Sequence, residues 1–130
     1  MTTELTYLVA TLVLAMVQMI MPAAGRTLEF GISWNAGARD QTPESHNPVV
    51  GRLERAKTNL YETLPLFIGA VLIAHVTGAE SALTLWGVAL YFWARVAYVP
   101  LYALGVPYIR SLVWLVSLAG LILILVALFI

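Results

Sequence analysis

The strongest indication of chemistry in the sequence is a stripe of polar side chains within residues 52–65. Read as a helix, this segment places two cations, an amide and a carboxylate on one face, at spacings of three, four and three. They are Arg52, Arg55, Asn59 and Glu62. The segment leads directly into the apolar residues 66–76, and ionisable groups that enter a membrane are costly unless they face protein, water or a ligand.

Two interpretations of this first stripe stay open at the level of sequence. Arginines pair bidentately with carboxylates and a glutamate accepts an amine, so the stripe could bind a polyanion or a zwitterion. Alternatively, Arg55 pairs with Glu62 or Glu54 in a self-satisfied network that only fixes the helix register. The two differ in whether charged groups are left free to meet a ligand.

A second polar stripe lies in a later apolar segment, at spacings of four, three and four. Its members are Tyr91, Arg95, Tyr98 and Tyr102. As a site, they would supply a cation and hydroxyl donors to the wall of a cleft. The alternative is a buried Arg95 neutralised by Glu62, with the tyrosines at the membrane interface.

Arg110 and Ser111 form the third candidate, near the start of a final helix. A cation and a hydroxyl there would stabilise a thiolate or a developing oxyanion through charge and helix dipole. The alternative is an interfacial arginine followed by an ordinary serine. His46 and His75 do not make a metal pair, so no metal is expected, and the chain has no cysteine, so any reacting thiol must come from a ligand.

The elements that must position these residues are four long apolar segments. The chain has 130 residues, is 61% hydrophobic and carries no net charge, which indicates an integral membrane protein without a basic surface for nucleic acid. We predict an all-α, four-helix membrane bundle in a single domain. The helices are expected at about 4–25, 48–77, 81–104 and 107–130, with a polar loop at 26–47. Pro22 and Gly25 mark the end of the first helix, and Pro65 is expected to kink the second beside Glu62.

The distribution of basic residues predicts the orientation. Those near the first connection are Arg26, Arg39, Arg52, Arg55 and Lys57, and Arg110 follows the connection between helices three and four. The opposite side has Glu4 and Glu80 but no lysine or arginine. The positive-inside rule therefore places the loop at 26–47 in the cytoplasm and both termini outside. Both stripes and Arg110 then lie near the cytoplasmic end, where they could share one site.

These motifs resemble the MAPEG family (membrane-associated proteins in eicosanoid and glutathione metabolism) over nearly the whole chain. The first matching motif is Arg55-Ala56-Lys57-Thr58-Asn59-Leu60-Tyr61-Glu62, followed by Pro65 and Phe67. The second is Arg95-Val96-Ala97-Tyr98, followed by Tyr102, Gly105 and Arg110-Ser111. Short loops are similar to those of bacterial-type members, which implies an inner membrane.

The resemblance implies a homotrimer in the lipid bilayer, with glutathione held between neighbouring subunits. It implies that Arg110 and Ser111 activate the thiol for attack on a hydrophobic electrophile or lipid peroxide, as in a membrane glutathione transferase or peroxidase. The glutathione-binding residues by position are Arg55, Asn59, Glu62, Arg95, Tyr98 and Tyr102, with Arg52 a looser match.

The sequence also departs from the family pattern. Thr58 stands where prostaglandin E synthase-like members carry arginine, a loss for which Lys57 could compensate. The spacing from Tyr102 to Arg110 is one residue shorter than in those enzymes, and Asp40 lies in the loop where some members have a functional acid.

Two rival functions follow from the same residues. One is a non-catalytic lipid-binding or regulatory protein on the same scaffold, and the other is a proton or solute pathway through Glu62, extended by His75. Convergence of the polar residues around a thiol-sized cavity favours the enzyme, whereas ion pairs that close the cavity favour the non-catalytic protein.

Overall fold

The chain folds into helices alone, and four of them are long and apolar enough to cross a membrane. The computed structural model describes residues 1–130. The helices are α1 (Thr3–Phe30), α2 (Ile32–Ala36), α3 (Pro48–Val76), α4 (Ala82–Ala103) and α5 (Ile109–Ala127). The all-α membrane bundle predicted from the sequence is therefore confirmed.

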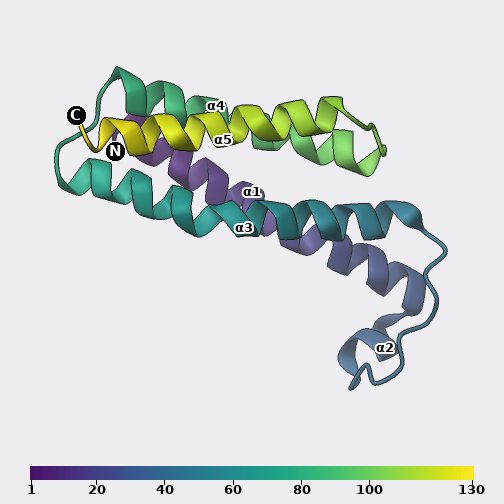
Figure 1. The fold of residues 1–130 in the computed structure, drawn as a ribbon. Helices are drawn as coiled ribbons and strands as arrows, with labels where there is room; N and C mark the ends of the chain where they lie inside the picture. The colour runs from purple at the N-terminus through teal and green to yellow at the C-terminus, as the bar shows by residue number, and fades with distance from the viewer.

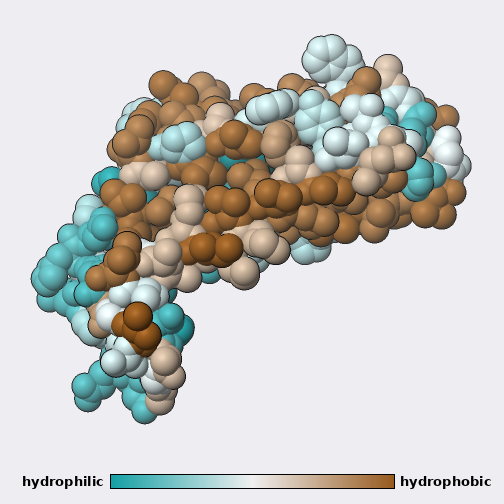
Figure 2. Space-filling model, turned by 180° about the vertical axis from the view of Figure 1, so that it is seen from behind, coloured by the Kyte–Doolittle hydropathy of each residue, from teal (hydrophilic) through white to brown (hydrophobic).

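The four long helices form a bundle with both termini at one end (Figure 1). α4 and α5 lie side by side and make the most extensive contact in the structure, while α1 packs mainly against α3. The short α2 and the segment leading to α3 lie at the end away from the termini. In Figure 2, hydrophobic side chains cover most of the helical face and hydrophilic ones gather at the end that carries α2.

The first helix runs five residues past the predicted end at residue 25. Pro22 lies inside it, and Gly25 serves packing: a Cβ atom there would lie 2.8 Å from Cγ2 of Val50 on α3. The helix ends instead at Gly31, whose φ of 94° suits glycine and whose N–H donates to the carbonyl of Thr27. The segment expected to be a loop at 26–47 thus includes the last turn of α1 and all of α2.

α3 begins where the capping residues predict. The side chain of Asn47 accepts a hydrogen bond from the backbone N–H of Val49 at 3.1 Å, and Pro48 occupies the first turn. The helix has 29 residues, and at about 1.5 Å per residue it is roughly 44 Å long, longer than the hydrocarbon core of a bilayer. Its polar N-terminal turns therefore project toward one membrane surface.

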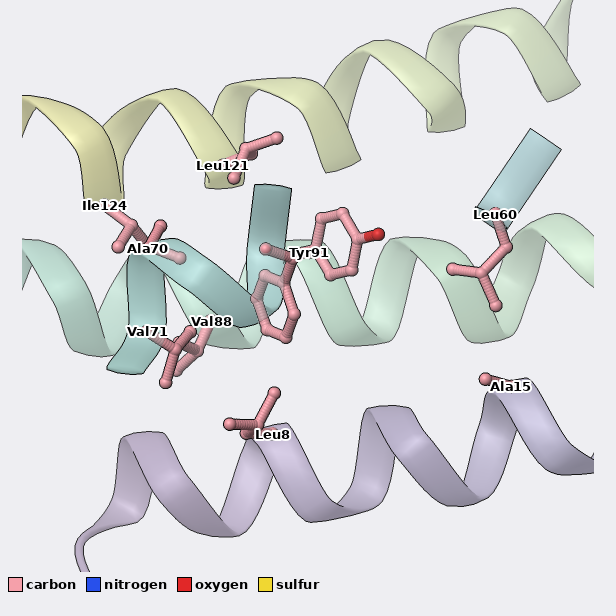
Figure 3. Packing of buried hydrophobic residues seen from close by; sticks show 10 residues of the cluster. Leu8, Ala15, Leu60, Ala70, Val71, Val88, Tyr91, Leu121 and Ile124 are labelled. Atoms are coloured by element: carbon pink, nitrogen blue, oxygen red, sulfur yellow. The ribbon is translucent and has the colours of Figure 1, made fainter. Parts of the chain in front are cut away.

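A core of apolar side chains from α1, α3, α4 and α5 fixes the helices relative to one another (Figure 3). Tyr91 of α4 is fully buried and stacks on Phe67 of α3, with ring centroids 4.1 Å apart. Its hydroxyl also lies 2.8 Å from the hydroxyl of Thr63. Because Tyr91 belongs to the core, only Arg95, Tyr98 and Tyr102 of its stripe are left to build a site.

At the end of the bundle that carries the termini, Glu80 ties the connection between α3 and α4 to the start of the chain. The hydroxyl of Thr2 donates to Oε2 of Glu80 at 2.7 Å, and Nδ1 of His75 lies 3.3 Å from Oε1. The hydrogen bond from Thr2, followed by the interaction with His75, lowers the pKa of Glu80 from 4.5.

This lowered pKa predicts a pH-dependent contribution to stability. A carboxylate with a depressed folded-state pKa stabilises the fold fully above 4.5, and loses that contribution as the pH falls through the lower folded value. We therefore expect Glu80→Gln to be less stable than the wild type at neutral pH and equal to it in strong acid. Thermal unfolding in detergent across this range measures the difference, and a difference independent of pH would contradict the assignment.

Candidate functional site

A polar cavity of about 450 Å³ lies between the first half of α3, the last turns of α4 and the first turns of α5. This is the end of the bundle away from the termini (Figure 1). Its lining residues are Arg55, Thr58, Asn59, Glu62, Tyr98, Tyr102, Arg110, Ser111 and Trp114. The structure thus brings all of the predicted site residues to one cavity except Arg52 and Arg95.

Tyr102 lies between the two cations of the cavity. The Nε–H group of Arg55 donates to the Tyr102 hydroxyl at 3.3 Å, and the guanidinium carbon of Arg110 lies 4.4 Å from the ring centroid. Tyr98 meets the same ring edge-on, with centroids 5.6 Å apart. The ring therefore supports one arginine from α3 and one from α5, and Arg110 reaches the cavity despite its shorter spacing from Tyr102.

Arg95 lies behind the cavity wall. It is fully buried, and its Nη1 donates to Oδ1 of Asn59 at 2.8 Å while its guanidinium carbon lies 4.5 Å from the centroid of Tyr98. Its Nε and Nη2 atoms have no hydrogen-bond partner. Because Asn59 uses its carbonyl oxygen for Arg95, its amide N–H groups remain available to an acceptor in the cavity.

Arg52 and Lys57 point away from the cavity. Nη1 of Arg52 donates to the backbone carbonyl of Ala103 at 3.3 Å, where it satisfies one of the last carbonyls of α4. The Lys57 ammonium pairs with the Glu54 carboxylate at 2.6 Å, and neither Lys57 nor Glu54 lines the cavity. Lys57 therefore does not compensate for the absence of an arginine at position 58. The hydroxyl of Thr58 donates to the backbone carbonyl of Glu54 in the same helix.

The charged side chains of the cavity form no ion pairs within the chain. The salt bridges of the structure are Arg26–Glu54, Lys57–Glu54 and His75–Glu80. Arg55, Glu62 and Arg110 take part in none of them, and Arg95 has no carboxylate partner. The ion pairs that would close the cavity, Arg55 or Arg95 with Glu62, are not formed in this structure.

Sequence reasoning did not identify Trp114 as a cavity residue. Trp114 is four residues after Arg110 and three after Ser111, so helical spacing places the three on one face of α5. That spacing could have revealed it. Asp40, by contrast, is exposed in the connection between α2 and α3 and does not line the cavity.

The cavity combines two arginines, one glutamate, an amide and two phenolic hydroxyls around a space of about 450 Å³. Such a set can hold carboxylates at the arginines and an ammonium group at the glutamate. Arg110 and Ser111 can stabilise a thiolate or an oxyanion beside them. The structure has no group of three or more histidine, aspartate or glutamate side chains arranged to hold a metal ion.

Four apolar helices and a polar cavity at one end define a helical-bundle integral membrane protein. The chain belongs to the MAPEG family, because the model of that family matches residues 5–130, essentially the whole chain. The comparisons with curated proteins and with solved structures found no match. Membership confirms the predicted family, and it makes this chain a membrane protein of glutathione or eicosanoid metabolism in the general sense.

Proposed function

We propose that this protein is a glutathione-dependent membrane transferase or peroxidase. The observation that carries the proposal is the convergence of Arg55, Glu62 and Arg110 on one cavity without any ion pair among them. Ionisable side chains within membrane-spanning helices are costly unless a partner or ligand satisfies them. A charged ligand of mixed sign satisfies both the cations and the carboxylate.

Glutathione fits this set of groups. It carries two carboxylates, one ammonium group and a thiol, and the cavity offers arginines for the carboxylates and Glu62 for the ammonium. The amide N–H groups of Asn59, oriented by Arg95, donate to a further carbonyl or carboxylate oxygen. Tyr98 and Tyr102 contribute hydroxyl groups to the same wall.

Arg110 and Ser111 then act on the thiol. A cation beside the sulfur favours the charged form and lowers the pKa of the thiol, so that the proton passes to water and a thiolate remains. The thiolate is the nucleophile that attacks a hydrophobic electrophile from the bilayer and displaces its leaving group. With a lipid peroxide, the thiolate sulfur takes the terminal oxygen and becomes a sulfenic acid, the lipid leaves as an alcohol, and a second glutathione converts the sulfenic acid to a disulfide and water. The leucines exposed along α5, Leu112 and Leu115, give this helix an apolar outer surface beside the cavity.

We further propose a homotrimer with the cavity at its subunit boundary. Arg55, Thr58, Glu62 and Ser111 are exposed in the single chain, and charged groups are costly where they face lipid. A neighbouring copy would cover them. The mass of the intact complex in mild detergent tests this, and a monomer that still binds glutathione would contradict it.

The positive-inside rule predicts that the cavity lies at the cytoplasmic face of the membrane.

The role of Glu62 can be tested by changing both protein and ligand. A hydrogen bond to a charged group contributes about 1.5–3 kcal/mol, so we expect Glu62→Gln to weaken glutathione binding by at least about tenfold in calorimetry. A glutathione analogue without the amino group should bind the wild type and this variant equally. Glu54→Gln, which changes a carboxylate outside the cavity, should leave glutathione binding unchanged. Equal losses for both ligands would show that Glu62 does not hold the amine.

A further inference from the structure

A second polar cavity, of about 230 Å³, lies on the other side of α3, between α1, α2 and the first half of α3. Its lining residues are Met19, Ala23, Arg26, Trp34, Asn35, Arg39, Glu54 and Lys57. No residue is shared with the cavity of the proposed active site. The argument for a ligand in this second cavity therefore does not rest on the proposed function.

The second cavity has more positive than negative charge. Glu54 is its one carboxylate, and it forms a salt bridge with Lys57 at 2.6 Å and a longer one with Arg26 at 3.8 Å. Arg39 has no carboxylate partner: its guanidinium lies 5.2 Å from the centroid of the Trp34 ring and donates to the backbone carbonyl of Asn35. Three cations against one carboxylate leave two positive charges for a ligand to neutralise.

The second cavity also lies where a membrane surface is expected. Met19 and Ala23 belong to the face of α1 that continues into exposed apolar residues such as Met16 and Ile20. Trp34 belongs to a residue type that collects at the boundary between lipid and water. Figure 2 shows this transition, from the hydrophobic helices to the hydrophilic end that carries α2. A ligand with an anionic head and an apolar tail fits both parts.

We propose that this cavity binds the phosphate of an anionic phospholipid whose acyl chains lie along α1. Arg26 and Arg39 face the phosphate oxygens, since arginine matches phosphate geometry and basic pockets at the membrane surface recognise such head groups. A choline head group carries a positive charge, which the three basic side chains of the cavity would repel. A soluble phosphate ester would leave the apolar surface of α1 unused.

The test is native mass spectrometry of the intact protein in detergent, with phosphatidylglycerol or phosphatidylcholine added at the same concentration. We expect preferential adducts of phosphatidylglycerol. One basic side chain near a membrane surface contributes about 1 kcal/mol, so Arg39→Gln should weaken phosphatidylglycerol binding by about fivefold. Arg39 lies in an exposed segment, so this variant is expected to fold. Arg52→Gln removes the same charge from the same end of the bundle but outside the cavity, and it should bind as the wild type does.

A second substitution is expected to change phosphatidylglycerol affinity in the opposite direction. Glu54→Gln removes the carboxylate that competes for Arg26 and Lys57, so it should bind phosphatidylglycerol more tightly than the wild type. Equal binding of the two lipids, or unchanged binding in Arg39→Gln, would overturn the proposal. Glycerol phosphate that binds as tightly as phosphatidylglycerol would also overturn it, because the site would then belong to a soluble phosphate ester.

Discussion

Arg110→Ala is expected to abolish formation of the glutathione thiolate while the protein still binds glutathione. Arg110 is one of the two cations that line the cavity, and it lies over the ring of Tyr102 at the start of α5. Removing one group that stabilises a developing anion typically lowers the rate by about 10²–10³-fold. We therefore expect a loss of that size in kcat/KM with a soluble aryl halide, together with loss of the ultraviolet thiolate absorbance. In the proposed function Arg55 and Glu62 bind glutathione, and both are still present in this variant.

The conservative variant separates a chemical role of Arg110 from a structural one. Arg110→Lys keeps the charge and should retain part of the thiolate signal, although it lacks the planar guanidinium that lies on Tyr102. Equal thermal stability of the wild type, Arg110→Ala and Arg110→Lys would show that the fold is intact in both variants. Unchanged thiolate absorbance in Arg110→Ala, with glutathione bound, would remove Arg110 from its assigned role.

Gly120→Ala is expected to produce a large loss of stability from a single added methyl group. A Cβ atom at Gly120 of α5 would lie 2.6 Å from the carbonyl oxygen of Gly87 and 2.7 Å from the backbone nitrogen of Tyr91, both on α4. Backbone atoms cannot rotate away as a side chain can, so the two helices must separate. Overpacking of a core costs about 1–3 kcal/mol or more, and we expect at least the upper part of this range. Thermal unfolding in detergent, followed by circular dichroism, measures the effect.

Gly69→Ala is the matched control, since a Cβ atom there meets nothing within 4 Å. Within a helix this change should be neutral or stabilising by up to about 1 kcal/mol. If both variants lose the same stability, the close approach of α4 and α5 is not what Gly120 provides. Separation of these helices would also displace Tyr98 and Arg110, so Gly120→Ala should lose glutathione binding with its stability.

The sequence predicts the membrane helices well, because each must carry a long apolar run whatever its neighbours are. It does not predict where α1 ends, since a glycine can terminate a helix or allow a close approach. Gly25 allows α1 to approach Val50 of α3, and Gly31 ends the helix. Only tertiary packing distinguishes these two uses of the same residue.

Helical spacing likewise identifies the face of a site residue but not its depth. Arg52, Arg55 and Arg95 all belong to polar stripes in the sequence, yet they occupy three different positions. Arg55 lines the cavity, Arg95 is buried behind Asn59, and Arg52 caps the end of α4. These differences come from the packing of α3 against α4, which periodicity within one helix does not encode.

We propose that this cavity binds glutathione and lowers the pKa of its thiol. The most direct test is ultraviolet difference absorbance of the purified protein during titration with glutathione at neutral pH, with S-methylglutathione as the control ligand. We predict a thiolate signal that saturates with glutathione and is absent with the methylated analogue. No thiolate signal, together with no heat of glutathione binding in calorimetry, would contradict the claim and favour a non-catalytic membrane protein on the same scaffold.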